Sequence, residues 1–212
     1  MTLQHKLPGL LREFLPTTLL VLGIFACRST LADWYTVPTG SMLPTIVEGD
    51  RILVDKLAYD VKLPFSNIIV SRLQEPQIGD IVVFEHPTDG KRMVKRLVAG
   101  PGDTIAMRDN RLILNGQAVS YQASGNHIYE DLGTRHTLQW LKNGNPYTSF
   151  AAVTLGNDEY LMLGDNRNNS TDSRFFGVVP RELLQGKAER VLFSKVPEQL
   201  AVRKERALKK LI

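Results

Sequence analysis

Residues 79–98 read GDIVVFEHPTDGKRMVKRLV, and this stretch decides the fold class. Its two largely apolar runs, Ile81–Phe84 and Met93–Val98, are short and rich in β-branched residues, and Pro, Asp and Gly lie between them. Short runs bounded by turn residues are typical of β-strands. Similar runs occur elsewhere after residue 35, at Arg51–Val54, Leu112–Leu114, Tyr160–Leu163 and Val191–Phe193. We therefore expect a mainly β fold with an antiparallel sheet as its core.

Changes in composition along the chain indicate how it is divided. Residues 115–157 contain fewer apolar runs and more Asn, Gly, Ser and Thr than the segments around them. We expect a smaller β-rich insertion or cap there, between the two parts of a core formed by residues 36–114 and 158–199. Residues 200–212 place apolar side chains at helical spacing beneath basic ones, which predicts a basic amphipathic helix on a membrane surface or a solvated chain end.

Composition and charge exclude several classes of protein. The 212 residues are 43% hydrophobic and 23% charged, which excludes a disordered, collagen-like or coiled-coil chain. The single cysteine, Cys27, forms neither an intramolecular disulfide nor a multi-cysteine zinc site, so we expect no metal and no cofactor. The net charge of +4 is located entirely in residues 203–212, so the rest of the chain offers no basic face and we expect no nucleic-acid partner.

The N-terminal region contains an uncharged apolar run, Phe14–Cys27, preceded by basic residues. Extended to the aromatic pair at 34–35, the run is long enough to predict a single transmembrane anchor over residues 14–35. A cleavable signal peptide and a buried core helix are the alternatives. The positive-inside rule then places residues 1–13 in the cytoplasm and the chain after residue 35 on the extracytoplasmic side, with membrane lipid as a partner.

A Gly-Ser pair bracketed by prolines is the first candidate for chemistry. It lies in Val37–Thr45, which reads VPTGSMLPT. The prolines fix a tight extended turn that could expose the Ser41 hydroxyl and direct backbone N–H groups at an oxyanion. The alternative is an ordinary Pro-rich linker.

Lys95 is the second candidate. In a strand over residues 92–98 it shares a face with Met93 and Leu97, so its ammonium lies among apolar neighbours. Burial disfavours the charged form and would lower the pKa of the amine enough for it to act as a general base. The alternative is a lysine that reaches solvent from the edge of a strand.

The polar stretch Gly164–Arg174 is the third candidate, and it reads GDNRNNSTDSR. An EF-hand needs an oxygen ligand at its third position, where this chain has Arg167, so calcium binding is rejected. On the residues alone we expect a structural loop in which Asp172 pairs with Arg174 and Asp165 caps a turn.

Taken together and in this order after an apolar segment, these blocks resemble bacterial type I signal peptidase, a membrane-bound Ser-Lys endopeptidase. The resemblance covers most of residues 10–195. The matching blocks are Pro38–Thr45, Gly49–Lys56, Gly79–Phe84, Val94–Val98 with Pro101–Asp103, and Gly164–Arg167 through Ser173–Arg174. The fold that it implies is a mainly β catalytic core with a smaller β insertion.

The resemblance implies a role for each residue that matches the family's motifs. Ser41 matches the nucleophile and Lys95 the general base that removes its proton. Thr39 falls where the family has a hydroxyl that forms the oxyanion hole with the Ser41 backbone N–H. Ser170 matches the hydroxyl that orients the lysine amine.

Further residues are expected to support the site or to bind substrate. Asp172 and Arg174 match a supporting ion pair beneath the site. Met42, Ile81 and Val83 are our candidates for a groove that binds an extended peptide by strand addition.

The resemblance also implies a substrate and a location. The substrates would be exported preproteins, cleaved after a small-x-small site by an enzyme anchored once in the bacterial inner membrane. One alternative is a specialised member of the family that matures a dedicated substrate such as a conjugative pilin. Others are a self-cleaving Ser-Lys repressor, which would carry a DNA-binding helix-turn-helix in front, and a non-enzymatic anchored β-rich binding module.

Overall fold

The computed structural model describes residues 14–18, 20–21, 31–125, 127–140, 147–196, 198–199 and 201–212. As expected from the sequence, the fold is mainly antiparallel β. The strands are β1 (Ala32–Thr36), β2 (Asp50–Asp55), β3 (Asp60–Lys62), β4 (Ile69–Arg72), β5 (Ile81–Glu85), β6 (Arg92–Ala99), β7 (Thr104–Arg108), β8 (Arg111–Leu114), β9 (Gln117–Ala118), β10 (Ser120–Ser124), β11 (His127–Asp131), β12 (Arg135–Leu138), β13 (Phe150–Thr154), β14 (Glu159–Leu163), β15 (Val179–Pro180) and β16 (Leu184–Ser194). After β1, the helical elements of the described residues are α2 (Ser173–Phe176) and the 3₁₀ turns η1 (Arg181–Leu183) and η2 (Lys204–Arg206).

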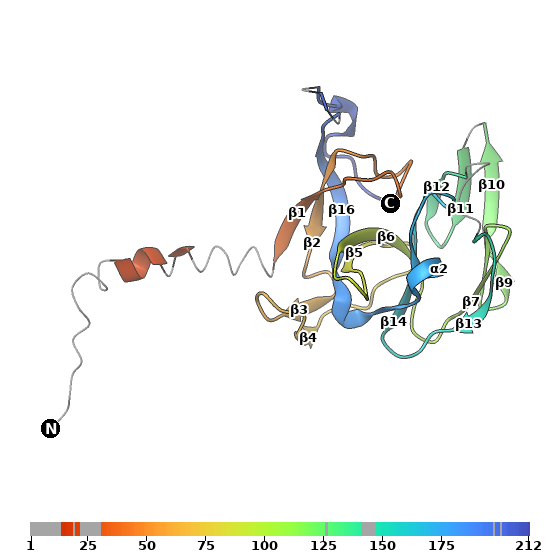
Figure 1. The fold of residues 1–212 in the computed structure, drawn as a ribbon, viewed down its shortest axis with the longest axis horizontal. Coiled ribbons are helices and arrows are strands. Elements are labelled where there is room, and N and C mark those ends of the chain that lie inside the picture. Colours follow the sequence, from red (N-terminus) through yellow and green to blue (C-terminus); the bar gives the residue numbers. More distant parts are fainter. Residues whose placement is uncertain are drawn as a thin grey trace.

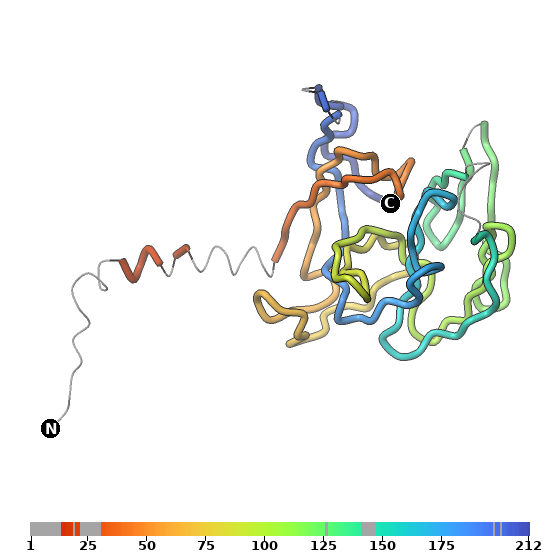
Figure 2. Tube along the Cα trace, in the orientation of Figure 1, coloured from red at the N-terminus to blue at the C-terminus, as the bar shows by residue number. Residues whose placement is uncertain are grey.

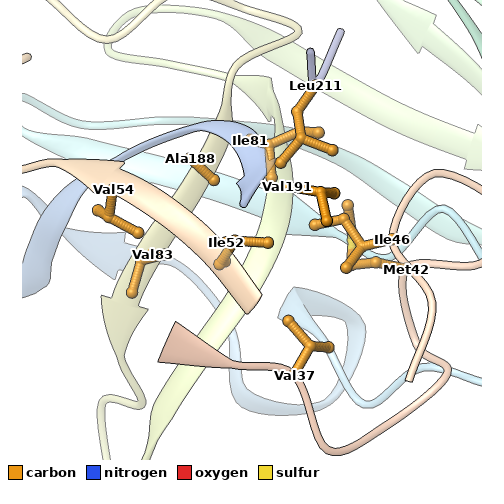
Figure 3. Close-up of a cluster of buried hydrophobic side chains, with 10 residues drawn as sticks. All are labelled: Val37, Met42, Ile46, Ile52, Val54, Ile81, Val83, Ala188, Val191 and Leu211. Carbon is orange, nitrogen blue, oxygen red and sulfur yellow. The ribbon is translucent and has the colours of Figure 1, made fainter. Parts of the chain in front are cut away.

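The larger part of the protein is a seven-stranded sheet in the order β1-β2-β16-β5-β6-β14-β15 (Figure 1). In β2, Ile52 and Val54 are buried and their neighbours are only partly so, because alternate residues of a strand face opposite sides of a sheet. Burial of such side chains stabilises the sheet by about 1.5–3 kcal/mol each. The cluster that they join is shown in Figure 3 and consists of Val37, Met42, Ile46, Ile52, Val54, Ile81, Val83, Ala188, Val191 and Leu211.

Smaller sheets form a second unit between β6 and β14. One has the order β13-β7-β8-β9 and the other β10-β11-β12 (Figure 1). The unit begins at Thr104, before the expected boundary at residue 115, because β7 and β8 pair with β13 and β9 and not with the larger sheet. The chain changes direction just before this point at Gly102, whose φ of 80° suits glycine.

The expected anchor over residues 14–35 does not extend to its predicted end. Residues 32–35 lie in β1 and pair with β2, in a register that runs from Ala32↔Asp55 to Thr36↔Arg51. Residues 14–18 and 20–21 are helical, whereas residues 19 and 22–30 lie outside the described part of the chain. Within the described part, no helix is both long enough and apolar enough to cross a bilayer. Anchoring by the segment that ends before Ala32 stays a prediction.

The C-terminal residues 201–212 are attached to the larger sheet by hydrogen bonds while most of their side chains stay exposed, and they form neither the expected amphipathic helix nor a frayed end. Arg206 pairs with the fully buried Asp50, with Nε 2.9 Å from Oδ1. Leu211 joins the first core cluster, and its backbone N–H donates to the Glu189 carbonyl oxygen. The chain therefore ends between the two units (Figure 2). The apolar spacing of this tail reflects one buried leucine rather than a helical face.

Candidate active site

Ser41 lies in a tight loop between β1 and β2. The loop is closed by hydrogen bonds from the Leu43 N–H to the Gly40 carbonyl and from the Ile46 N–H to the Met42 carbonyl. Met42 and Ile46 have no exposed surface and fix the loop to the core (Figure 3). Because the residues on the C-terminal side of Ser41 are held by packing, the hydroxyl has a defined position. The alternative of an ordinary linker does not describe this packed loop.

Asn166 also holds the Ser41 loop, a role that reasoning from the sequence missed. Its backbone N–H donates to the Ser41 carbonyl oxygen at 3.1 Å, and its Nδ2 donates to the Gly40 carbonyl oxygen at 3.0 Å. These bonds come from the loop after β14, which is distant in sequence. The signal available from the sequence was the presence of Asn166 in the Gly164–Arg174 block.

Lys95 lies on β6, and its Nζ is 2.6 Å from Ser41 Oγ. The side chain is only 3% exposed. Burial lowers the pKa of this amine to about 8, although the carboxylates of Asp172 and Asp165 oppose the shift. An amine with that pKa is partly neutral near neutral pH, which is what a general base requires. The structure therefore places the expected nucleophile and base in direct contact, and the lysine does not reach solvent.

Thr39 lies beside the nucleophile. Its Oγ1 is 3.4 Å from Ser41 Oγ, and its side chain is exposed. This position puts a second hydroxyl next to the oxygen that would attack the substrate. A role in the oxyanion hole stays a prediction, because here the hydroxyl is directed at Ser41 Oγ.

Ser170 and Gly164 pack tightly below Ser41. A Cβ on Gly164 would lie 2.2 Å from Ser170 Oγ and 2.5 Å from the Ser41 carbonyl oxygen, so only glycine fits. Ser170 is 7% exposed, and its hydroxyl lies close to Gly164. Its expected action on the Lys95 amine stays a prediction.

Asp172 and Arg174 form the expected ion pair. Arg174 Nε donates to Asp172 Oδ1 and Nη2 donates to Oδ2, both at 2.7 Å, so the pair is bidentate. Asp172 also accepts the Gly164 N–H at 3.1 Å, and Arg174 donates to the Arg167 carbonyl oxygen at 2.6 Å. The pair thus holds both ends of the loop that contains Ser170.

A second buried ion pair, between Arg96 and Asp165, lies next to the site and was not predicted. Arg96 Nε and Nη2 each donate to Asp165 at 2.8 Å, and neither side chain is exposed. Thr45 Oγ1 donates to the same carboxylate at 2.5 Å. Burial alone would raise the pKa of Asp165, but Arg96 and Thr45 hold it below the usual value. Asp165 therefore pairs across the fold and is not the turn cap expected from the sequence.

A groove of about 290 Å³ lies between β1 and β6 and reaches the Ser41 loop at Pro38. Its walls also include Tyr35, Val83 and the pair at 93–94. Of the expected substrate-binding residues, only Val83 lines this groove, and its side chain is also 1% exposed. Met42 and Ile81 are buried in the core with exposed fractions of 0% and 2%, so they support the site from beneath.

Comparison with known proteins gives a consistent result. The family described as "Signal peptidase, peptidase S26" matches residues 11–193, which include all the site residues described above. Signal peptidase I of Pseudomonas aeruginosa is 34% identical in an alignment that covers 82% of this chain and 65% of that protein. The chain thus spans about two thirds of the length of that relative. Signal peptidase I of Pseudomonas fluorescens is 34% identical over 86% of this chain and 71% of its own length.

Two further comparisons carry the same name. Signal peptidase I of Rickettsia typhi is 34% identical over 86% of this chain and 80% of its own length. A crystal structure of a signal peptidase I from Enterococcus faecalis is 34% identical to this chain. It covers 54% of this chain and 97% of its own, with a TM-score of 0.38.

Proposed function

This chain belongs to the signal peptidase family, peptidase S26, and from that premise we propose that it is a serine endopeptidase that removes signal peptides from exported preproteins. Ser41 is the nucleophile and Lys95 is the general base. The observation that carries the proposal is the 2.6 Å contact between Ser41 Oγ and Nζ of the buried Lys95.

The reaction proceeds by acylation of Ser41 and then hydrolysis. Neutral Lys95 takes the proton of Ser41 Oγ while that oxygen attacks the scissile carbonyl carbon, giving a tetrahedral oxyanion. The Ser41 N–H and the Thr39 hydroxyl donate hydrogen bonds to the oxyanion. Protonated Lys95 gives its proton to the leaving amine, the C–N bond breaks, and the signal peptide remains esterified to Ser41. Water then repeats the sequence, with Lys95 again as the base, and releases the signal peptide.

The pKa of Lys95 explains how an amine performs this work near neutral pH. At a pKa of about 8, roughly half of the lysine is neutral at pH 8, compared with less than about 1% for an unperturbed lysine. Desolvation produces this shift, so the burial of the amine is part of the mechanism. The Ser170 hydroxyl orients the amine, and the Asp172–Arg174 pair holds the Ser170 loop.

The substrate binds in the groove between β1 and β6 as an added strand. β6 pairs with β14 only from Arg96 onward, so on that side the backbone of residues 92–95 has no strand partner among the described residues. An extended peptide can form hydrogen bonds with such an edge while its alternate side chains point into the groove. Preference for small-x-small sequences follows if the space next to Ser41 and Val94 accepts only small side chains.

The enzyme is attached to the bacterial inner membrane once, by the apolar segment that begins at Phe14, with the catalytic domain outside. A second contact with lipid is supported by the β3–β4 hairpin, where Leu63, Phe65, Ile68 and Val70 are 50–78% exposed. Exposed apolar residues grouped in this way mark a surface that contacts a membrane or another protein. Resistance of the full chain to carbonate extraction, together with protease accessibility from the extracytoplasmic side, would test this topology.

The activity can be tested with the detergent-solubilised full chain and a radiolabelled secretory preprotein. We expect cleavage after a small-x-small site, identified by sequencing the new N-terminus. Ser41→Ala and Lys95→Ala should abolish cleavage, while Lys91→Ala, which changes an exposed lysine just before β6, should retain it. Thermal unfolding would establish that each variant is folded. Cleavage that survives either active-site substitution, or a folded wild type that cleaves no preprotein, would contradict the proposal.

A further inference from the structure

We propose that a basic cleft next to the Ser41 loop binds an acidic segment of the substrate, in the chain that follows the scissile bond. The cleft has a volume of about 340 Å³ and lies between β11, β12, the C-terminal tail and the pair at 44–45. The substrate groove meets the loop at Pro38, before Ser41, whereas the cleft meets it after Ser41. The inference rests on the proposed function and adds a second substrate contact to it.

Cations line the cleft without a matching acidic side chain. Arg135, Lys209 and Lys210 are exposed, and no side-chain carboxylate of the described residues forms an ion pair with them. The Arg135 guanidinium lies over the Tyr129 ring, 4.2 Å from its centroid, which holds it in the cleft wall. An unpaired group of cations on a concave surface favours an anionic ligand.

The acidic side chain next to Tyr129 in the cleft wall is bound inside the protein. Glu130 on β11 is completely buried and pairs with Arg167 and His136. Burial alone would raise the pKa of Glu130, but Arg167 and His136 lower it to about 2, so its charge is already matched. Ile212 also lines the cleft, and its oxygen accepts from Arg96 Nη2 at 3.0 Å. Glu130 therefore does not neutralise the exposed cations of the cleft.

The fold of the tail explains why lysines lie here. Arg206 is used internally, in its ion pair with Asp50, and Arg203 donates to the Glu48 carbonyl oxygen at 3.0 Å. These contacts fix the course of the tail along β16, where the Val191 N–H donates to the Lys209 carbonyl oxygen at 2.8 Å. Arg203 and Arg206 thus attach the tail to the rest of the fold, whereas Lys209 and Lys210 line the cleft.

A substrate polypeptide is the occupant that the geometry favours. A peptide cleaved at Ser41 must continue past the nucleophile, and the cleft includes Pro44 and Thr45, which follow Ser41 closely. Thr45 follows Ser41 by four residues, so the two lie at most about 14 Å apart. Four extended residues of a bound peptide can cover that distance. Asp or Glu at roughly the third to sixth position after the scissile bond would therefore meet the lysines.

Binding can be measured without hydrolysis. Two fluorescent peptides would represent the chain after the scissile bond, one with Glu at the third to sixth positions and one with Gln. Each is titrated into the detergent-solubilised full chain while anisotropy is recorded. We expect the Glu peptide to bind about tenfold more tightly at low salt, with a smaller difference at high salt, because exposed charge pairs are individually weak and screened.

Paired variants locate the site. The double variant Lys209→Gln, Lys210→Gln should reduce the tenfold ratio to below about twofold. Lys204→Gln is the matched control, since this exposed tail lysine does not line the cleft, and it should keep the full ratio. Equal binding of the two peptides to the wild type, or an unchanged ratio in the double variant, would overturn the proposal.

Cleavage and lipid measurements separate this inference from its alternatives. Preproteins that differ only in those Glu or Gln positions should differ about fivefold in kcat/KM on the wild type, and the difference should be lost in the double variant. If neither preprotein is cleaved, the proposed function fails. The ratio of the two peptide affinities still tests whether the cleft binds acidic peptides. If the double variant loses binding to phosphatidylglycerol vesicles but not to the Glu peptide, the cleft binds lipid and the inference is wrong.

Discussion

Lys95 and Arg96 are adjacent on β6, yet only the charge of Arg96 is paired with a carboxylate. Arg96 forms a bidentate pair with Asp165, and both side chains are fully buried. Lys95 contacts the Ser41 hydroxyl, and no carboxylate of the described residues pairs with it directly. A buried cation with a carboxylate partner keeps its charge and holds the structure, whereas a buried amine without one has a lowered pKa and can accept a proton. The contrast predicts different consequences for changes at the two positions.

The largest effect is expected at Lys95. Lys95→Arg should lower kcat/KM by about 10⁴-fold, because a guanidinium does not lose its proton near neutral pH and cannot act as the base. Peptide-cleavage kinetics would measure the loss. Lys91→Arg is the matched control, because it makes the same change at an exposed lysine just before β6, and it should leave kcat/KM unchanged. Near-normal turnover in Lys95→Arg would show that Lys95 is not the general base.

The next effect is on stability and concerns Asp165. Asp165→Asn leaves the buried Arg96 guanidinium without a counter-charge, and we expect a loss of about 3–5 kcal/mol in the free energy of unfolding. Urea denaturation of the detergent-solubilised protein would measure it. The double variant Arg96→Met, Asp165→Leu should recover much of that loss, because it buries no unpaired charge. A stable Asp165→Asn variant would show that Arg96, like Lys95, does not need a carboxylate partner.

Thr39→Val should lose about 3 kcal/mol of transition-state stabilisation with little change in substrate binding, since it removes one donor to the oxyanion. The expected signature is a lower kcat with an unchanged KM. Thr39→Ser keeps the hydroxyl and should retain activity. Unchanged turnover in Thr39→Val would exclude this hydroxyl from the oxyanion hole.

The smallest effect is the response of the wild type to pH. Lys95 must be neutral to accept the proton, so kcat/KM should rise with pH and level off above the pKa of about 8. It should fall about tenfold for each unit below that value, or roughly 100-fold from the plateau at pH 6. Asp165 keeps its charge over this range, because its pKa is held below the usual value. An activity that is flat between about pH 6 and 8 would contradict the assignment of Lys95.

Local patterns predicted some elements better than others. The runs Ile81–Phe84 and Met93–Val98 became β5 and β6, because β-branched residues and turn signals act over short distances. The tail was predicted poorly, because its position depends on Asp50, which is far away in sequence. The boundary of the smaller unit was also misplaced, since β7 and β8 have the same kind of sequence as core strands and differ only in their partners.

The site residues differ in the same way: those that depend on local sequence could be predicted, and those that depend on distant partners could not. Ser41 and Lys95 could be selected from local sequence and from the order of the motifs, and Asp172 with Arg174 could be paired because they are close in sequence. The partners of Asp165 and Asn166 could not be predicted, since they lie on β6 and in the Ser41 loop. The sequence thus predicted chemical type and short-range pairs, but it did not predict long-range contacts.

The sequence by itself determined a mainly β chain and supplied a serine, a lysine and a polar loop in an order typical of one family. The tertiary structure alone decided that the lysine is buried against the serine and that the adjacent Arg96 forms an ion pair with Asp165. It also decided that Lys209 and Lys210 of the tail line a cleft. The physical reason is that pKa values and buried ion pairs depend on desolvation and on distances across the fold. Those quantities exist only once the strands have paired and packed.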